Sequence, residues 1–241
     1  MTLEDQMAVG EVAALSPGAV QVLDSHGIDY CCGGRRTLED VCAEKGLSAR
    51  QLMEEIDAGD AVAGSPEDDW KTVPLRRLIG HIVSTHHEFL KLELPRIGQR
   101  LAKVVEVHGE KDPALGELQP VYDGMRRELE LHMHKEELML FPAIGRYEAA
   151  AESGKPLPPA LFGSVANSIA AMEKEHDSAG VELRRIRDLT RDFEPPEYAC
   201  TTYRSLLDGL RALESDLRTH VHLENNILFP RAIALEKSYP K

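Results

Sequence analysis

The sequence lacks the features of several large protein classes. Its 241 residues contain no stretch near eighteen consecutive apolar residues, which a transmembrane helix needs, and Met1-Thr2-Leu3-Glu4-Asp5 lacks the basic flank and apolar run of a signal peptide. Basic residues are scarce, with 28 against 41 acids, and the net charge of -13 would repel a nucleic-acid backbone. We therefore expect a cytoplasmic protein that binds neither membranes nor nucleic acid.

Cysteine is scarce as well, which bears on disulfides and zinc. The four cysteines are Cys31, Cys32, Cys42 and Cys200. An adjacent pair with two scattered residues does not fit a secreted disulfide framework, and the absence of a C-x-x-C pair gives no support to a zinc ribbon. A reducing compartment suits this pattern, and we expect Cys42 and Cys200 to be small buried side chains.

The acidic charge is concentrated at the start of the chain. Residues 1–69 hold four bases and fifteen acids, a net charge of -11, whereas residues 70–241 have a net charge of -2. Residues 59–69, GDAVAGSPEDD, are small and acidic and show no apolar periodicity. The sequence therefore predicts a small acidic helical domain with a C-terminal linker over 1–69 and a second domain over 70–241.

Short helices are expected in the first domain. Capping residues and glycines predict one helix from Ser16-Pro17 to Gly27, another from Thr37 to Gly46, and a third that begins at Ser48. Between the first two lies DYCCGGRR, residues 29–36, in which two glycines follow two cysteines. This composition predicts a tight, accessible turn that carries both thiols.

The second domain reads as a helical bundle. Aromatic residues make up only 5% of the chain, and no strand pattern interrupts four long segments of helical spacing, Leu75–His108, Ala114–Phe141, Pro159–Phe193 and Tyr198–Phe229. Short connections between helices favour antiparallel packing, so we expect an all-α fold with a four-helix bundle. Pro95 is expected to kink the first segment or split it in two.

An internal repeat marks the second domain. Residues 132–142, HMHKEELMLFP, recur as residues 220–230, HVHLENNILFP, with six identical positions. His87 precedes the first copy by 45 residues and His176 precedes the second by 44. The domain therefore consists of two related helical hairpins, each with a single histidine on its first helix and an H-x-x-x-E pair on its second.

The spacing of these residues predicts a metal site. Positions four apart on a helix point the same way, so each H-x-x-x-E pair can reach one cavity. Buried carboxylates and imidazoles are costly to desolvate without a cation. A single zinc takes about four ligands, whereas two carboxylate-bridged irons use all six donors. The predicted ligands are His87, His132, Glu136, His176, His220 and Glu224.

Other residues near the repeat have less certain roles from sequence. His134 and His222 lie two positions past the ligands and are expected to face away or to serve a structural role. His108 is either a charge at a helix end or an accessory ligand. Glu173 and Glu175 flank His176 and are either surface acids or acids that orient a ligand.

The vicinal thiols of Cys31 and Cys32 form a second candidate site, a redox pair. Arg35 and Arg36 follow them, and a helix is expected to start at Thr37, so cations and helix amides would favour the thiolate. Such a pair can transfer electrons, bind a labile metal or exchange disulfides, and it can also pack inertly under a glycine turn. The residues alone leave these alternatives open.

The motifs together resemble a known family. The sequence is similar to the repair-of-iron-centres family of bacterial di-iron proteins, which join a short cysteine-containing domain to a hemerythrin-like bundle. The resemblance spans nearly the whole chain and rests on DYCCGG at 29–34, VHG at 107–109, EHD at 175–177, PEYACTT at 196–202 and HLENNILFP at 222–230.

The resemblance implies a protein that restores iron-sulfur clusters under nitrosative or oxidative stress. It implies two non-haem irons with the four histidines as terminal ligands, Glu136 and Glu224 as bridges, and an oxo or hydroxo bridge. Iron donation and reduction of nitric oxide to nitrous oxide are both implied, with Cys31 and Cys32 in redox transfer. Implied partners are damaged iron-sulfur proteins or a cluster-assembly scaffold, and nitric oxide or oxygen. Enzymatic activity and oligomeric state, with a homodimer one option, stay open.

Two other functions compete with repair. Hemerythrin-type carriers and sensors bind oxygen or nitric oxide in the same fold. Those carriers use five histidines and an aspartate in the last motif, whereas this chain has Glu224 there. Ferritin-like oxidases carry E-x-x-H on two helices. Only Glu173 and His176 fit that pattern here, because Ser84 stands at the equivalent position before His87.

Overall fold

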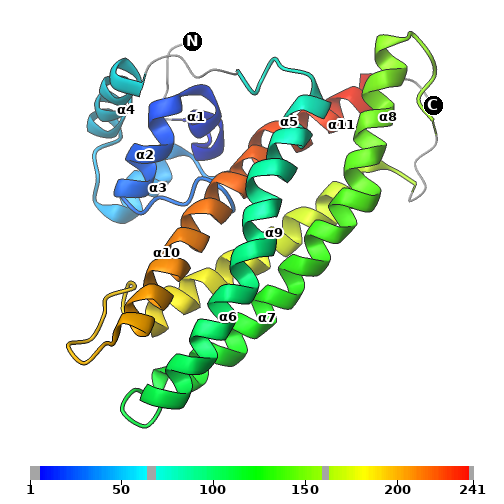
Figure 1. Ribbon diagram of the computed structural model, residues 1–241. Coiled ribbons are helices and arrows are strands. Elements are labelled where there is room, and N and C mark those ends of the chain that lie inside the picture. Colours follow the sequence, from blue (N-terminus) through cyan, green and yellow to red (C-terminus); the bar gives the residue numbers. More distant parts are fainter. Residues whose placement is uncertain (1–5, 64–68, 159–162, 239–241) are drawn as a thin grey trace. The chain divides into compact units, whose positions relative to one another are not determined.

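The computed structural model describes residues 6–63, 69–158 and 163–238. These residues form helices joined by short loops, without a β-strand among them, and an isolated bridge joins Ala8 to Thr37 (Figure 1). The predicted all-α fold is confirmed. None of the helices in these ranges combines the length and apolar character that a membrane span requires.

Contacts divide the chain into two compact units. The terminal unit comprises Met1–Leu78 with Arg218–Lys241, and the central unit comprises Ile79–Leu217. The last helices of the chain thus group by contact with the N-terminal residues. The two units are described in turn below.

The terminal unit begins with four helices, α1 (Val9–Leu15), α2 (Pro17–Ser25), α3 (Leu38–Lys45) and α4 (Ala49–Ala63). Ser16 caps α2 by accepting the Ala19 N–H at 3.1 Å, and Thr37 caps α3 by accepting the Asp40 N–H at 3.1 Å. Both starts are as predicted from the capping residues. Helix α1 has Ala8 at its N-cap, which makes no side-chain capping bond, so the sequence carried no signal for it.

The central unit is built from long helices. They comprise α6 (Glu88–His108), α7 (Ala114–Lys135), α8 (Phe141–Glu152) and α9 (Val165–Leu189). Two helices belong partly to each unit, α5 (Leu75–Ile82) and α10 (Thr201–His222), and α11 (Phe229–Ser238) belongs to the terminal unit. Helix α7 packs along both α6 and α9, and Figure 1 shows α6 and α7 side by side.

Three π-helical turns interrupt these helices. They are η1 (Val83–His87), η2 (Glu136–Leu140) and η3 (Leu223–Leu228). Helix α6 runs through Pro95 without a break, so the expected split at that proline does not occur. The irregularity in the first segment lies instead at η1. A π turn has i→i+5 bonds, and it inserts one residue into the helical register.

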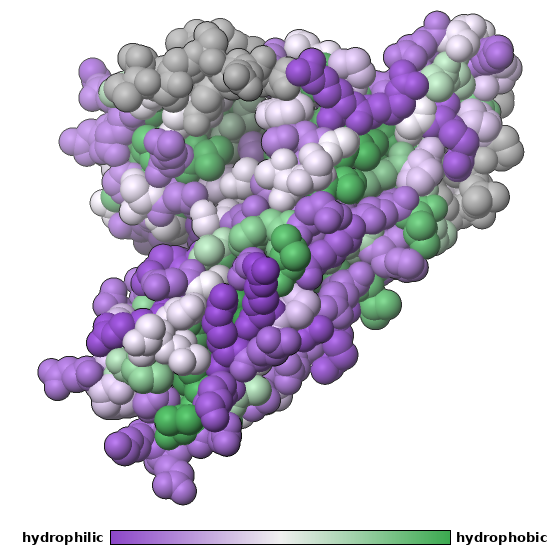
Figure 2. Space-filling model, viewed as in Figure 1, coloured by the Kyte–Doolittle hydropathy of each residue, from purple (hydrophilic) through white to green (hydrophobic). Residues whose placement is uncertain are grey.

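Apolar residues at helical spacing fill the core of the central unit. On α6, Leu90, Leu94, Ile97 and Leu101 are almost fully buried and recur every three or four positions. Each such side chain contributes about 1.5–3 kcal/mol when removed from water. The exposed face of the long helices is mainly hydrophilic, with separate apolar side chains (Figure 2). This core fixes the helices that carry the predicted metal ligands of the unit.

A second core holds the terminal unit together. Leu23, Ile28, Leu38 and Ile56 from the N-terminal helices and loops share one buried cluster with Val221 near the end of α10. The N-terminal helices therefore pack on the segment of the chain that carries His220. In sequence the two are almost two hundred residues apart, so no local pattern could predict this contact.

Candidate metal centre

Three of the six predicted ligands lie in π-helical turns. His87 closes η1, Glu136 opens η2 and Glu224 is the second residue of η3. π turns often occur at functional sites, because the inserted residue redirects side chains away from their regular helical positions. In both copies of the repeat a π turn begins at or next to the glutamate of the H-x-x-x-E pair.

Four of the predicted ligands come together inside the central unit. His87, His132, Glu136 and His176 are all at most 2% exposed. The Nε2 atoms of His132 and His176 lie 2.9 Å apart. One oxygen of Glu136 lies 3.3 Å from His132 Nε2 and the other lies 3.5 Å from His87 Nε2. The carboxylate therefore stands between two imidazoles, with one oxygen toward each.

The outer nitrogens of two imidazoles are held by acids. His87 Nδ1 lies 2.8 Å from Glu137 Oε1, and His132 Nδ1 lies 2.9 Å from Glu175 Oε2. An ionised carboxylate only accepts, so each Nδ1 donates and each neutral ring keeps its lone pair on Nε2. That lone pair faces a Glu136 oxygen, which is repulsive unless a cation or proton lies between them. Histidines that bind metals have this arrangement.

The two supporting acids are anchored by lysines. Lys91 Nζ lies 2.9 Å from Glu137 Oε1, and Lys135 Nζ contacts Glu175. Hydrogen bonds from His132 and Lys135 lower the pKa of Glu175 to about 2. Burial acts to raise the pKa of Glu137, but hydrogen bonds from Lys91 and His87 lower it overall. Both acids are therefore ionised near neutral pH and strengthen their imidazoles as donors.

Sequence reasoning left the role of one of these acids open and missed the other. Glu175 was an alternative between a surface acid and one that orients a ligand, and it contacts His132. Glu137 carried no recognised signal, because a residue next to Glu136 points about 100° away on a regular helix. The only available hint was the adjacency of two acids in the first copy of the repeat.

The remaining two predicted ligands lie in the terminal unit. His220 and Glu224 are at most 1% exposed, and His220 Nε2 lies 3.0 Å from Glu224 Oε1. The H-x-x-x-E spacing thus places imidazole and carboxylate on one side of the helix. Two buried groups of this kind form a donor set that suits a metal ion.

The other histidines have different surroundings. His134 is exposed, whereas His222 is buried against the Tyr30 ring at a centroid distance of 5.5 Å. Burial lowers the pKa of His222 to about 4, so it packs as a neutral ring. His108 lies 21 residues after His87, about 30 Å along the chain's helix, which excludes it as an accessory ligand.

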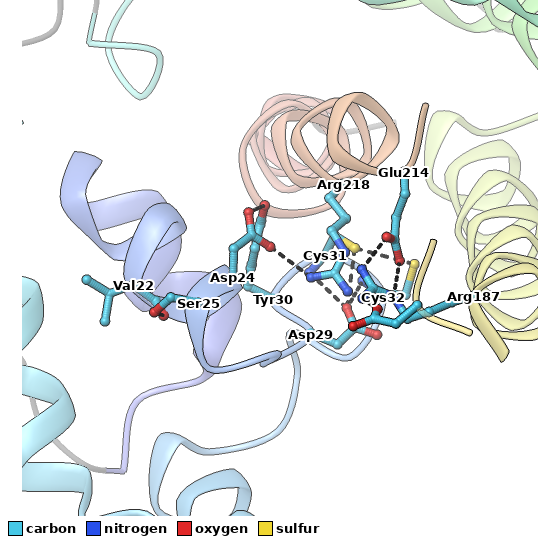
Figure 3. Close-up of polar contacts among 11 residues, drawn as sticks. Val22, Asp24, Ser25, Asp29, Tyr30, Cys31, Cys32, Arg187, Glu214 and Arg218 are labelled. Atoms are coloured by element: carbon cyan, nitrogen blue, oxygen red, sulfur yellow. Dashed lines mark hydrogen bonds and ion pairs between the residues drawn. The ribbon is translucent and has the colours of Figure 1, made fainter. Parts of the chain in front are cut away.

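The two adjacent cysteines lie in a tight turn around Asp29, as predicted. The expected accessibility of both thiols is wrong for Cys31, which is buried, whereas Cys32 is partly exposed. The carboxylate of Asp29 accepts the backbone N–H of Cys31 at 3.2 Å and of Cys32 at 3.0 Å, and the Cys31 thiol lies 3.3 Å from the same oxygen (Figure 3). The sulfurs are 3.7 Å apart. Ligand atoms of Asp29, Cys31 and Cys32 all lie within 4.8 Å of one another, close enough to share a cation.

The surroundings of Cys31 oppose its expected ionisation. We expected Arg35 and Arg36 to favour the thiolate, but the hydrogen bond to Cys32, burial and the charge of Asp29 raise the pKa of Cys31 well above its usual value. The prediction is wrong for this thiol. The sequence places the arginines nearby, whereas the turn places the carboxylate nearest.

Asparagines hold this turn against the helix that carries His220. Asn225 donates to the Cys31 carbonyl at 3.2 Å and Asn226 to the Tyr30 carbonyl at 3.0 Å. Arg218 and Asp24 add an ion pair at 2.8 Å (Figure 3). The equivalent positions in the first copy of the repeat are Glu137 and Leu138. The two copies therefore differ where one supports a histidine and the other binds the cysteine turn.

Comparison with known domains assigns the class of the protein. Residues 78–232 match the hemerythrin HHE cation-binding domain, and residues 5–60 match ScdA_N, a domain of unknown function. The chain belongs to the hemerythrin-type proteins.

Whole-chain relatives narrow this class. The chain is 36% identical over 226 residues to the iron-sulfur cluster repair protein YtfE of Yersinia pseudotuberculosis, covering 94% of this chain and 96% of the relative. Identity and coverage are the same for YtfE of Yersinia pestis. For YtfE of Pectobacterium carotovorum the identity is 35% over 235 residues, covering 97% and 99%. The chain belongs to this family of iron-sulfur cluster repair proteins, as the resemblance implied.

Proposed function

We propose that this protein holds two non-haem irons and uses them in the repair of iron-sulfur clusters damaged by nitrosative or oxidative stress. The proposed ligands are His87, His132, Glu136, His176, His220 and Glu224, all of which lie within the matched cation-binding domain. The names of the relatives support the repair function.

The position of Glu136 carries the proposal. Its two oxygens face two different imidazoles, whose Nδ1 atoms are both held by other acids. A carboxylate that bridges two metal ions needs this arrangement, whereas one that binds a single ion does not. By the repeat, Glu224 corresponds to Glu136, so we assign it the second bridge. Imidazole and carboxylate donors in this ratio suit iron.

The donors of the central unit lie close to the surface. Glu137 and Glu175, which support His87 and His132, have side chains 27% and 36% exposed. Their imidazoles are thus one side chain from water, which suits exchange of a bound ion. When bound, two irons would supply iron for a damaged cluster and two electrons for reduction of nitric oxide to nitrous oxide. Nitric oxide reductase activity is part of this proposal.

We assign Cys31 and Cys32 a redox role beside the iron centre. Two thiols at 3.7 Å release two electrons and two protons when they form a disulfide. The asparagines that hold their turn are the residues after Glu224 on η3. We propose that the acidic domain, residues 1–69, serves the bundle, residues 70–241, in this way. We further propose that the protein acts in the reducing cytoplasm, and that its partners are damaged iron-sulfur proteins or a cluster-assembly scaffold.

Iron content of bridging-ligand variants tests the centre. Glu136→Leu and Glu224→Leu should each lose most of the two irons per chain, and apoprotein should fail to restore a damaged iron-sulfur enzyme that the iron-loaded protein restores. Glu128→Gln, exposed on α7, is the matched control and should keep both irons.

Two results would contradict the proposal. Leucine variants that still carry two irons per chain would exclude the bridging role. A reduced protein that binds oxygen reversibly and gives no cluster recovery would instead favour a hemerythrin-type oxygen or nitric oxide binder.

A further inference from the structure

A cysteine and a histidine meet at the end of the central unit that lies away from the proposed irons. Cys200 is exposed, contrary to the burial expected from its sequence, and its Sγ lies 3.3 Å from His108 Nε2. His108 is the last residue of α6 and is 9% exposed. Cys200 precedes α10 by one residue, about 30 Å along that helix from His220.

The histidine is fixed in its orientation toward the thiol. Its ring stands 5.5 Å from the Tyr203 ring and 6.0 Å from the Tyr198 ring, measured between centroids. Both tyrosine hydroxyls donate to the buried carboxylate of Asp112, at 2.9 Å and 3.1 Å. The tyrosines are thus held in place, and they confine the imidazole to an orientation in which Nε2 meets Sγ.

The start of α10 adds to the effect of the histidine. The first helical hydrogen bond runs from the Arg204 N–H to the Cys200 carbonyl at 3.0 Å, so Cys200 is the N-cap residue. The backbone N–H groups of Tyr203 and Thr202 reach its sulfur. Uncompensated amides at a helix start favour an anion. His108, at the C-terminal end of α6, lies where a helix favours a cation.

We propose that Cys200 is a reactive thiol that forms mixed disulfides with small disulfides such as oxidised glutathione, with His108 as its proton acceptor. An exposed nucleophile, a buried base aimed at it and helix amides behind it are the parts that such a reaction needs. The site is separate from the proposed irons and from Cys31 and Cys32.

The exchange is balanced by the two reactants. The Cys200 proton moves to His108 Nε2, and the thiolate attacks one sulfur of the small disulfide. The S–S bond of the reagent breaks as a new S–S bond to Cys200 forms. One half of the reagent leaves as a thiolate and takes the proton from His108. Cys200 is oxidised, the released thiol is reduced, and no further oxidant is needed.

The electrostatic surroundings set the pH at which the exchange begins. The hydrogen bond with His108, followed by the backbone N–H groups, lowers the pKa of Cys200 to about 7. The other charged or titratable groups in the cluster are Tyr198, Tyr203, Asp112 and Arg191, and Asp112 binds the tyrosines and Arg191. The thiolate therefore grows as pH rises through about 7, below the range of an ordinary thiol at about 8.5.

The test follows the reaction of the full-length, iron-loaded protein with oxidised glutathione across pH. The adduct on Cys200 is measured by peptide mass spectrometry, which separates it from the other cysteines. The rate at Cys200 should reach half of its maximum near pH 7. His108→Gln should move this midpoint up by about 1–2 pH units and lower the rate at pH 7 about two- to sixfold, because the lost thiolate outweighs the gain in nucleophilicity.

Controls separate this site from the repair function. Cys200→Ser should lose the adduct and keep the iron content and cluster recovery of the wild type. A wild-type rate that still rises through pH 9, or a midpoint that His108→Gln leaves unchanged, would overturn the proposal. The wild-type profile needs no substitution, so it decides the matter even if His108→Gln does not fold. Loss of iron in Cys200→Ser would show that the two sites are not separate.

Discussion

The partner of Nδ1 distinguishes His87 and His132 from the equally buried His222. His87 and His132 each present Nδ1 to an acid, so Nε2 faces the donor cluster. His222 is as buried as they are, but its Nδ1 lies 2.9 Å from the Asn226 amide and its pKa falls to about 4. An acid on the outer nitrogen prepares an imidazole for a metal. An amide and an aromatic ring leave it a neutral packing group.

Removing one supporting acid should weaken metal binding without removing a ligand. We expect Glu175→Gln to lower iron affinity about 10–100-fold, since the amide cannot polarise His132 as the carboxylate does. The measurement is the rate and extent of iron loss to a colorimetric ferrous chelator. Glu128→Gln, an exposed substitution of the same type on α7, should leave both unchanged.

The comparison also tests the orientation argument. If Glu175→Gln and Glu128→Gln lose iron equally slowly, the His132–Glu175 contact does not tune the site. Because the glutamine keeps the shape of the glutamate, an effect on iron alone, with an unchanged circular dichroism spectrum, reports on charge.

At the scale of the elements, close backbone approach holds the cysteine turn in place. A Cβ added at Gly34 would lie 2.5 Å from the Tyr30 carbonyl oxygen and 3.1 Å from Gly10 Cα. Both neighbours are backbone and cannot move aside. The turn that carries both thiols therefore depends on a missing side chain at this position, and so does its packing on α1.

Two glycine substitutions should have opposite effects. Gly34→Ala should destabilise the fold by about 1–3 kcal/mol, because overpacking forces the backbone to shift. Gly124→Ala, inside α7 with open space around the added Cβ, should stabilise it by about 0.5–1 kcal/mol through helix propensity. Urea unfolding followed by circular dichroism gives both values. A stabilising Gly34→Ala would show that the turn is not tightly packed.

The helices were predictable where local chemistry defines them. The capping residues Ser16 and Thr37 mark the starts of α2 and α3. The spacing in the repeat predicts that His220 and Glu224 lie on the same side of their helix. The π turns were not predictable, since no residue type specifies them. The exposure of Cys200 was predicted wrongly, and its contact with His108 was missed because the two residues lie 92 positions apart in sequence.

For the whole molecule, the donor set is a cost that metal binding offsets. Glu136 and Glu224 are fully buried among imidazoles. A carboxylate taken out of water is expensive. We therefore expect the buried donor residues to lower the stability of the apoprotein. A bound ion stabilises the folded state by about 2.7 kcal/mol when its concentration is 100 times the dissociation constant.

This cost predicts that iron reverses the order of stability of the wild type and Glu136→Leu. Without iron, Glu136→Leu should be more stable than the wild type by about 1–4 kcal/mol and should unfold at a higher temperature, because leucine has a similar size and removes a buried carboxylate. With ferrous iron the wild type should gain stability and the variant should not, so the order reverses. Thermal unfolding followed by circular dichroism, with and without iron under anaerobic conditions, measures both orders. If apo Glu136→Leu is the less stable protein, the carboxylate stabilises the empty fold, and burial of the donor set is not what limits the apoprotein.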